Sequence, residues 1–350
     1  MYEKFIILSA FFLTFLPSCF SSYPYNHRDA DPFMSSDVYY ETNHLHGHIT
    51  RSSHTKNRHG NYAPRSSPQA FNVNSFGAKA NGNDDSQAFM KAWQSACSST
   101  GIVYIVVPNN RKYMLKPVQF SGPCKSSLIV FKIYGMIEAW ENPSDYKVRR
   151  HWIVFENHVS GTRNILIQDS VIRTGDDCIS IVSGSENVRA TGITCGPGHG
   201  ISIGSLGEGN SEAYVSNVVV NKATLIGTTN GVRIKTWQGG RGMAKNIIFQ
   251  DIIMKNVTNP IIINQDYCDR VESCPEQKSA VQVSNVLYKN IQGTSSRPVA
   301  VNFACSKSIP CRGISMQNVK LVDQTQQDVS KASCSNVRLN TLGNVSPLYH

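Results

Sequence analysis

Short stretches in the second half of the chain place Val or Ile at every second position, which is the pattern of a strand with one buried face. Five stretches show it: CISIV from residue 178, GISIG from 200, GVRIK from 231, PIIIN from 260 and PVAVN from 298. Each stretch predicts a short strand. The positions that we expect to face the core are Ile179/Ile181, Ile201/Ile203, Val232/Ile234, Ile261/Ile263 and Val299.

A related segment precedes each of these strands, at a nearly constant distance. Six such segments align: RNILIQDSVI from residue 163, ENVRATGITC from 186, SNVVVNKATL from 216, KNIIFQDIIM from 245, SNVLYKNIQG from 284 and RGISMQNVKL from 312. Their second residue is Asn in five cases and Gly313 in the sixth. Successive segments are 23 to 39 residues apart, yet the first inward apolar residue of the following strand lies 14 or 15 residues after the Asn. Loops therefore absorb the differences in length, while two strands per repeat keep their register.

A repeat of short strands with this spacing predicts an all-β fold, a single-stranded parallel β-helix whose coils stack at about 4.8 Å. The repeated Asn residues are expected at turns, where each side-chain amide can bond to its equivalent in the next coil. A β-sandwich is the competing fold, but it would give hairpin signals and no fixed offset.

One helical pattern precedes the repeats. The stretch DDSQAFMKAWQSAC from residue 84 has Asp84 or Asp85 as an N-cap and an apolar face on one side. That face consists of Phe89, Ala92, Trp93 and Ala96. We expect this helix to cap the N-terminal end of the solenoid, and capping explains its acidic pair without any chemistry.

The first 68 residues do not share the repeat. Residues 1–22 place Lys4 ahead of an apolar run and small residues, which indicates a secretory signal peptide rather than a membrane anchor. Residues 23–68 are polar and hold six of the ten histidines, so we predict a disordered basic linker or pro-segment. A metal-binding His tract and loose binding of an acidic polymer stay open for it. The predicted solenoid domain covers residues 69–350.

Secretion would expose the cysteines to an oxidising compartment and so favour disulfides. Ten cysteines occur, and nine remain without the signal peptide, so one is free, bonded to another chain or without a former partner. The sequons at Asn256 and Asn344 fit a glycoprotein. The disulfides that we expect are Cys178–Cys195, Cys268–Cys274 and Cys305–Cys311.

The constant offset places polar residues that are distant in sequence on one face. An acidic pair lies just before Ile179, a histidine just before Ile201 in the next coil, and two cations beside Ile234 one coil further. With two residues that follow Ile263, the set is Asp176, Asp177, His199, Arg233, Lys235, Gln265 and Tyr267. Stacking predicts that they form one patch, about 15 Å tall at the spacing of a sheet.

This patch suits the hydrolysis of an acidic sugar chain. Two adjacent carboxyl groups can both face outward only if the chain bends, and Thr174-Gly175 supplies a bend. Because close like charges cannot both ionise freely, the pair divides into a proton donor and a carboxylate, as glycoside hydrolysis requires. Arg233 and Lys235 suit a sugar carboxylate, and His199 can orient one Asp or relay a proton. Each residue alone has an ordinary structural explanation, but their shared face indicates a site.

Four motifs in this part of the chain carry a resemblance to a known family. They are TGDDCISI, CGPGHGISIGSLG, GVRIKTWQGG and NQDYC, in that order. From about Phe71 to the C-terminus the chain resembles the polygalacturonases of glycoside hydrolase family 28, particularly the plant enzymes. The resemblance implies a right-handed parallel β-helix and inverting hydrolysis of the α-1,4-galacturonan of pectin, without a cofactor or a metal.

The resemblance also implies a role for each residue that matches a family motif. Asp176 resembles the general acid, Asp177 a carboxylate that activates water, and His199 the histidine that supports the proton path. The remaining residues resemble those that bind galacturonate: Arg233 and Lys235 at its carboxylate, and Tyr267 in the substrate site.

One family motif is missing from this sequence. Polygalacturonases usually carry Asn-Thr-Asp one coil before the acidic pair, and its Asp helps to position the water. Residues 151–164 read HWIVFENHVSGTRN instead. WIVFEN resembles a region several coils upstream in the family, and HVSGTRN resembles the stretch just after the missing motif. This pattern indicates an internal deletion joined near Asn157, and it predicts reduced turnover.

The net charge of +10 and the pI of about 9.1 favour an anionic partner, but charge alone leaves nucleic acid, acidic polysaccharide and membrane surfaces open. The resemblance selects pectin and homogalacturonan. We expect a secreted monomer in the cell wall, without nucleic-acid or membrane partners. The alternative function is non-hydrolytic pectin binding. A calcium-dependent pectate lyase would need a carboxylate cluster for Ca²⁺ that the sequence does not show.

Overall fold

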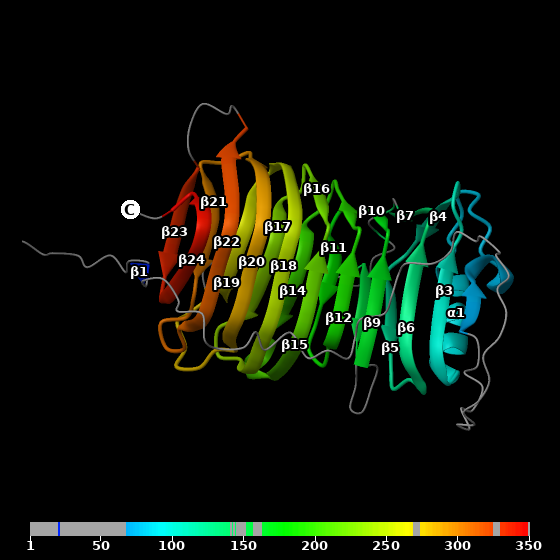
Figure 1. Cartoon of the computed structure of the whole chain (residues 1–350). Coiled ribbons are helices and arrows are strands. Elements are labelled where there is room, and N and C mark those ends of the chain that lie inside the picture. Colours follow the sequence, from blue (N-terminus) through cyan, green and yellow to red (C-terminus); the bar gives the residue numbers. More distant parts are fainter. Residues whose placement is uncertain are drawn as a thin grey trace, which may run out of the picture. The chain divides into compact units, whose positions relative to one another are not determined.

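The computed structural model of this protein describes residues 20–21, 68–140, 142, 144, 152–156, 163–268, 274–324 and 330–348. In these residues the chain winds in successive coils whose strands lie side by side (Figure 1). Every pairing between named strands is parallel. The predicted parallel β-helix is therefore confirmed, and its right-handed sense is the one that connections between parallel strands nearly always take.

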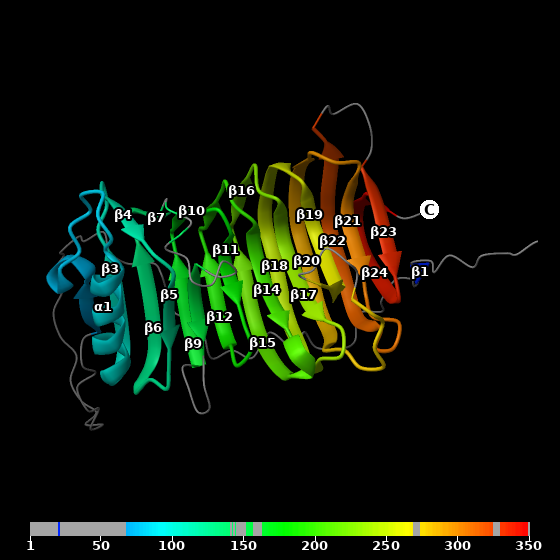
Figure 2. The same cartoon turned by 180° about the vertical axis from the view of Figure 1, so that it is seen from behind.

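The coils have three faces, which we call the long face, the site face and the short face (Figures 1 and 2). The long face contains β2 (Gln69–Asn72), β3 (Gly101–Val107), β6 (Ser126–Ile133), β9 (Arg163–Gln168), β12 (Glu186–Thr191), β15 (Glu212–Asn221), β18 (Arg241–Val257), β20 (Gln282–Ser295), β22 (Cys311–Asp323) and β24 (Val337–Ser346). The site face contains β5 (Val118–Ser121), β8 (Ile153–Glu156), β11 (Asp177–Ile181), β14 (Gly200–Leu206), β17 (Asn230–Trp237), β19 (Asn259–Tyr267), β21 (Val299–Ala304) and β23 (Lys331–Ser335). The short face contains β4 (Lys112–Leu115), β7 (Met136–Ala139), β10 (Val171–Arg173), β13 (Thr194–Cys195) and β16 (Thr224–Ile226).

The short face corrects the prediction of two strands per repeat. The segment RNILIQDSVI holds two strands, β9 and β10, and the first of the two residues between them, Asp169, has a positive φ of 50°. In later coils the two strands merge: β18 pairs with β15 through its first part and with β16 through its second. A corner inside an otherwise apolar segment has no signal in the alternation, so the third strand was missed.

The repeated Asn residues form the predicted ladder of side-chain amides. Asn217 donates to Asn187 at 3.0 Å, Asn246 to Asn217 at 3.0 Å, and Asn285 to Asn246 at 3.4 Å. All four residues have φ between 52° and 57°, a left-handed conformation that Asn tolerates better than most residues. The ladder thus stacks the corners of successive coils. The side chain of Asn164 lies outside the described residues.

Inward-facing side chains of all coils form one continuous apolar core. On the site face Ile179, Ile201, Val232 and Ile261 stack in one row, as predicted. The expectation for Val299 was wrong, because its side chain is 37% exposed and Val301 stacks on Ile261 instead. The ladder between β21 and β23 shifts register between Val299 and Val301, and a shift of this kind is invisible in the sequence.

The helix α1 (Ser86–Ser98) caps the first coils as predicted, with Asp85 at its N-cap. The expected apolar face of α1 is buried. Both acidic residues are occupied by backbone bonds: Asp84 accepts from the N–H of Ser86, and Asp85 accepts from the N–H groups of Lys79 and Ala80. In the part of the chain that the structure describes, no helix combines the length and the apolar character needed to cross a membrane. The short 3₁₀ helices η1 (Val73–Phe76) and η3 (Glu208–Asn210) complete the secondary structure.

Four disulfides join described cysteines, and three of them are the predicted pairs. The fourth, Cys97–Cys124, links α1 to the loop before β6 and was not predicted. Cys334 is disulfide-bonded as well. Of the first 22 residues the structure describes only β1 (Phe20–Ser21), which pairs with β24. The predicted linker, residues 23–68, lies outside the described residues except for Pro68.

Candidate active site

The acidic pair lies at the start of β11, where the ladder to β14 shifts register between Asp177 and Ile179. Thr174 Oγ1 accepts the N–H of Asp176 at 3.1 Å, and Asp176 Oδ1 accepts the N–H of Asp177 at 2.7 Å. These bonds hold the bend that was predicted at Thr174-Gly175. As a result both carboxyl groups turn to the same side of the strand, although they are adjacent in sequence.

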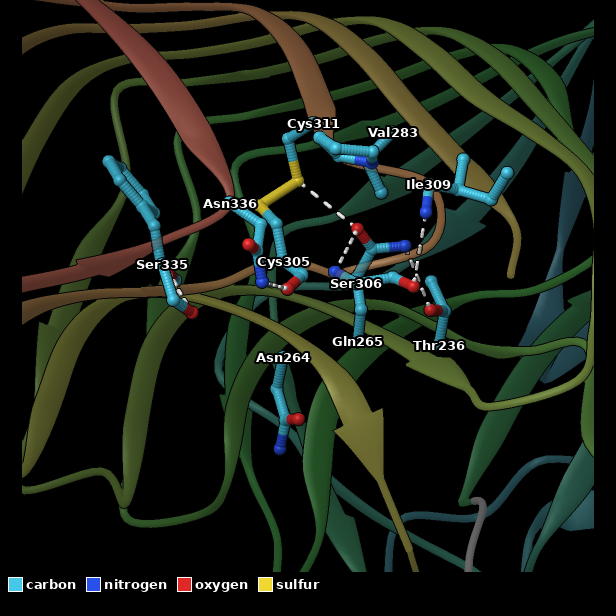
Figure 3. The surroundings of a disulfide bond; sticks show 12 residues. Thr236, Asn264, Gln265, Val283, Cys305, Ser306, Ile309, Cys311, Ser335 and Asn336 are labelled. Atoms are coloured by element: carbon cyan, nitrogen blue, oxygen red, sulfur yellow. Dashed lines mark hydrogen bonds between the residues drawn. A yellow bond between two sulfur atoms is a disulfide. The ribbon is translucent and has the colours of Figure 1, made fainter. Parts of the chain in front are cut away.

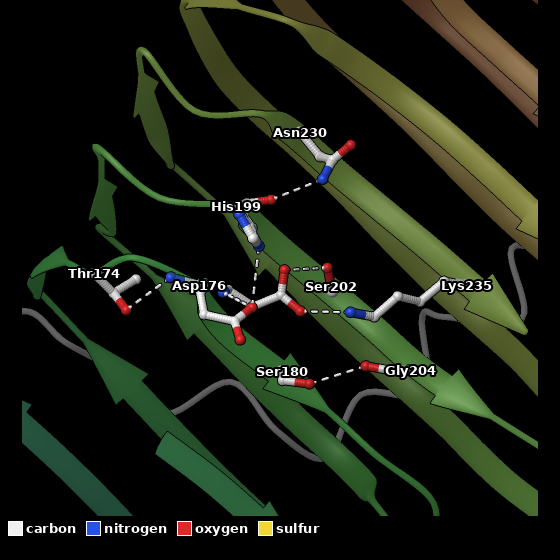
Figure 4. A network of polar contacts seen from close by, with 9 residues as sticks. Thr174, Asp176, Ser180, His199, Ser202, Gly204, Asn230 and Lys235 are labelled. Carbon is white, nitrogen blue, oxygen red and sulfur yellow. Dashed lines mark hydrogen bonds and ion pairs between the residues drawn. The ribbon is translucent and has the colours of Figure 1, made fainter. Parts of the chain in front are cut away.

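Asp177 is the buried member of the pair, with 4% of the residue exposed. Its Oδ2 accepts from Lys235 Nζ at 2.8 Å, and its Oδ1 accepts from Ser202 Oγ at 2.8 Å (Figure 4). Both donors are themselves buried. An ammonium group and a hydroxyl group at these distances stabilise a charged carboxylate. The two oxygens of Asp177 are therefore each held by a buried donor.

Asp176 is the accessible member of the pair and faces His199 from the next coil. His199 Nδ1 lies 3.1 Å from Asp176 Oδ1, and 47% of the His199 side chain and 21% of the Asp176 side chain are exposed. This hydrogen bond is the main cause that raises the pKa of His199 above its ordinary value, and burial opposes the rise. The two side chains can therefore share a proton at a position that a ligand can reach.

Arg233 adds a cation without a partner to the same face. Its guanidinium carbon lies 5.1 Å from the ring centroid of Tyr267, and its Nε is buried without a hydrogen bond. Among the described residues Arg233 has no ion-pair partner. Burial lowers the pKa of Arg233, and the charge of Asp177 opposes this. A half-buried guanidinium on an aromatic ring, without a counter-ion, is suited to binding an anionic group.

The structure thus gathers six of the seven residues of the predicted patch on one face, from β11, β14, β17 and β19 and the turns that lead into them. We expected Lys235 to contact a sugar, but the structure places its side chain elsewhere. Its side chain is 8% exposed, its ammonium group is bonded to Asp177, and it lies 5.5 Å from the Tyr267 ring. In this arrangement Lys235 acts on the acidic pair, and Arg233 is the cation that remains for a ligand.

Gln265 does not join the patch, and that prediction was wrong. Its side chain is fully buried and donates to the carbonyl of Val281 at 2.7 Å, while its Oε1 accepts from the N–H of Ser306 at 3.1 Å (Figure 3). It lies beside the Cys305–Cys311 disulfide and ties neighbouring coils together. The ladder between β17 and β19 shifts register between Lys235 and Trp237, so alternation from Ile263 does not predict which residues face outward.

Three residues that matter for the site were not singled out from the sequence: Thr174 as an acceptor, Ser202 and Asn230. Ser202 had a usable signal, because it is the outward position between Ile201 and Ile203. Thr174 lies in a turn and Asn230 is the first residue of β17, and at such positions alternation gives no orientation.

The coil before the acidic pair places apolar side chains beside β11 in the part that the structure describes. Its strand β8 pairs with β11 so that Val154 lies beside Ser180, and both residues are buried. Trp152, just before β8, is inside the core and donates to the carbonyl of Leu115 at 2.9 Å. The predicted junction near Asn157 lies outside the described residues.

One group of described side chains could bring cation ligands together. Asp176, Asp177 and His199 offer ligand atoms within 4.8 Å of one another. However, the ammonium group of Lys235 already neutralises Asp177 and would repel a second cation. The donor set therefore fits acid–base chemistry better than metal binding.

This fold and this acidic site define a class of carbohydrate-cleaving enzymes, and comparison with known families agrees. Residues 157–344 match the glycosyl hydrolases family 28, and the chain belongs to this family. The chain is 70% identical to "Polygalacturonase QRT2" of Arabidopsis thaliana over 99% of its own length and 100% of that relative. It is 45% identical to "Polygalacturonase-2" of Solanum lycopersicum over 80% of each chain, and 43% identical to a polygalacturonase of Malus domestica.

The same comparisons bear on the missing motif. The alignment with the Arabidopsis relative runs over 439 positions, whereas this chain has 350 residues, so about 90 positions of the relative have no counterpart here. The family match begins at residue 157, where the sequence predicts the junction. Both observations agree with an internal deletion that removed coils before the acidic pair.

Proposed function

We propose that this protein is a secreted polygalacturonase-type hydrolase of the α-1,4-galacturonosyl linkages of pectin, with an incomplete catalytic site. The observation that carries the proposal is one polar network: Asp176 with His199, Asp177 with Lys235, and an unpaired Arg233 beside them. Three adjacent coils supply these groups, and a single sugar unit could contact them together. Family membership supports the reaction type.

In the proposed mechanism Asp176 donates a proton to the leaving oxygen. It is the accessible carboxyl group, and His199, whose pKa the bond to Asp176 raises, holds a proton that can pass to Asp176 as the leaving oxygen takes one. Asp177 cannot be the donor, because Lys235 and Ser202 hold it as a carboxylate. Arg233 binds the carboxylate of a galacturonate unit through its planar guanidinium group.

The role of Asp177 follows from its fixed oxygens. The ligand atoms of the two carboxyl groups lie within 4.8 Å of each other, closer than the roughly 6.5–9.5 Å typical of inverting glycosidases. Distance alone would favour a covalent, retaining mechanism. Each oxygen of Asp177 already accepts a hydrogen bond from a buried donor, which weakens it as a nucleophile. We assign Asp177 as a base toward water, with inversion at the anomeric carbon, as the resemblance to the family implies. The anomer released first, observed by proton NMR, distinguishes the two outcomes.

Turnover should be strongly reduced, because the family's third carboxylate is absent and the neighbouring coil presents Val154. A positioned acid or base contributes typically 10²–10⁴-fold. The experiment is release of reducing ends from polygalacturonate by the wild type and by an Asp176→Asn variant. We expect slow release that depends on Asp176. Full activity would contradict the incomplete site, and equal release by both proteins would contradict the proposed acid.

Pectin binding without hydrolysis is the second candidate function. It is favoured by the retained Arg233 and Tyr267 platform together with the positions that are missing upstream. Binding of polygalacturonate with no reducing ends released, even after long incubation, would select this function. We further propose that the protein acts as a monomer in the cell wall; secretion of the tagged full chain from plant cells and its mass in solution test this.

A further inference from the structure

The peptide group of His199 is held from two neighbouring coils. Its N–H donates to the carbonyl of Asp176 at 2.7 Å, in the coil before it. Its carbonyl accepts from Asn230 Nδ2 at 3.2 Å, in the coil after it (Figure 4). Asn230 is 4% exposed, so this bond is protected from water. The backbone of His199 is thus held through both its N–H group and its carbonyl group.

Asn230 is itself oriented by a second amide. Asn259 Nδ2 donates to Asn230 Oδ1 at 3.1 Å and to the carbonyl of Thr229 at 3.1 Å. Because the oxygen of Asn230 accepts from Asn259, its NH₂ group must face His199. A chain of amides therefore runs through three coils and ends on the His199 carbonyl. The corner ladder of the long face joins only equivalent side chains and reaches no site residue.

The backbone on either side of His199 is glycine, and it too is held by neighbouring coils: the carbonyl of Gly198 accepts from the N–H of Thr229 at 2.9 Å, and Gly200 pairs with Asp177. Both neighbours are glycines with positive φ, 154° at Gly198 and 92° at Gly200. A Cβ at Gly200 would lie 2.0 Å from the carbonyl oxygen of Asn230, so the close approach of the two coils requires glycine here. The ring of His199 is half exposed, and Asp176 is its one hydrogen-bond partner among the described residues.

We propose that Asn230, oriented by Asn259, is a positioning residue that fixes the His199 carbonyl and thereby keeps the imidazole on Asp176. Asn230 does not touch the reacting atoms; it acts through His199. The effect of Asn230 on turnover rests on the function proposed above. The hydrogen-bond geometry around His199 does not, so the geometry and the function can be tested separately.

The test is an NMR titration of the His199 imidazole in the full chain, with the signal assigned by its loss in His199→Gln. Asp176, Asp177 and Lys235 are the charged groups that act on this ring, and every test variant retains them. In wild type His199 should titrate above its ordinary pKa. In Asn230→Ala the midpoint should fall by about 0.5–1 pH unit, because part of the bond to charged Asp176 is lost.

Two further variants keep the proposal falsifiable. Asn259→Ala leaves the donor in place but removes its orientation, so it should shift the midpoint in the same direction by a smaller amount. Asn336→Ala is the matched control, because Asn336 donates to the carbonyl of Cys305 at 3.0 Å away from the site, and it should shift nothing. Thermal melting establishes which variants are folded.

A folded Asn230→Ala or Asn259→Ala protein whose His199 titrates as in wild type would overturn the proposal. If wild type releases reducing ends, Asn230→Ala should lower kcat and leave KM nearly unchanged, because Arg233 is retained. If wild type releases none, the proposed hydrolysis fails, while the titration still decides the role of Asn230.

Discussion

The coils on the two sides of β11 supply very different groups to the site. On the C-terminal side, β14 and β17 and their leading turns bring Ser202, His199, Lys235 and Arg233 to the acidic pair. On the N-terminal side, β8 brings Val154 to the same face. The backbone ladder nevertheless continues through both sides. Stacking of coils requires only parallel strands and an apolar interior, whereas the chemistry requires particular side chains at particular coils.

The interior shows the same contrast. Downstream of β11 the inward residues of β14, β17 and β19 are fully buried in close contact. A small apolar cavity lies inside the N-terminal coils, and Ile153, Ile167, Ile172 and Ile179 contribute to its lining. The predicted loss of coils would therefore leave the described coils stacked, and it would remove the upstream part of the site.

The largest effect is expected on the downstream side, at the buried ion pair. Lys235→Met would leave the Asp177 carboxylate buried without a counter-charge, and this costs about 3–5 kcal/mol of unfolding free energy. Urea denaturation measures it, with Arg233→Met as the control because Arg233 has no ion-pair partner among the described residues. Equal losses in the two variants would show that the pair is not the source of the difference.

A smaller difference is expected between the two parts of the core. Ile234→Phe inserts volume into a fully packed coil and should cost about 1–3 kcal/mol. Ile167→Phe should cost less, because the side chain of Ile167 lines the cavity and has space nearby. Thermal unfolding of both variants under identical conditions compares them. A greater loss for Ile167→Phe would mean that the coils near the junction are packed as tightly as the rest.

The corner ladder should contribute less than the core at any single position. Asn217→Ala removes two amide bonds and places Ala in a left-handed conformation, for a loss of about 1–2 kcal/mol. Asn217→Gly also removes the two amide bonds, but Gly adopts the left-handed backbone conformation without strain. The stability of Asn217→Gly should therefore lie between those of Asn217→Ala and wild type. If Asn217→Gly were as stable as wild type, the amide bonds would contribute nothing.

The smallest effect concerns the pH dependence of stability at the half-exposed His199. Its folded pKa is raised, so the interaction stabilises the fold fully below the unfolded value near 6.5 and is lost as pH rises through the folded pKa. Relative to His199→Gln, wild type should lose unfolding free energy as the pH rises above about 6.5. Parallel curves for the two proteins in urea would contradict the contact with Asp176.

Much of this fold could be predicted from the sequence, because a solenoid repeats its signals. The fixed offset between Asn and the inward residue placed Asp177, His199 and Arg233 on one face, although 56 positions separate the first from the last. It also predicted that the corner amides bond to one another. Both predictions rest on regular stacking, and they hold where the register is regular.

The failures lie where the register shifts or where burial decides the role of a side chain. Gln265 follows one such shift, and Val299 begins another. Both residues were assigned the wrong orientation. Whether Lys235 is buried and bonded to Asp177 depends on how far its long side chain extends across the coil that lies between them. Nothing in the order of residues determines that distance. Ser202 was missed although alternation marks it as an outward position, and Asn230 was missed because it begins its strand.

The central claim is that lost coils removed part of the chemistry and left the downstream half of the site in place. An insertion variant tests it most directly. In this variant a segment is inserted between Glu156 and Arg163, namely the segment of the Arabidopsis relative that has no counterpart in this chain. We expect the turnover of polygalacturonate to rise at least about 10²-fold, and to fall again with Asp176→Asn. A folded insertion variant that hydrolyses polygalacturonate no faster than this chain would contradict the account.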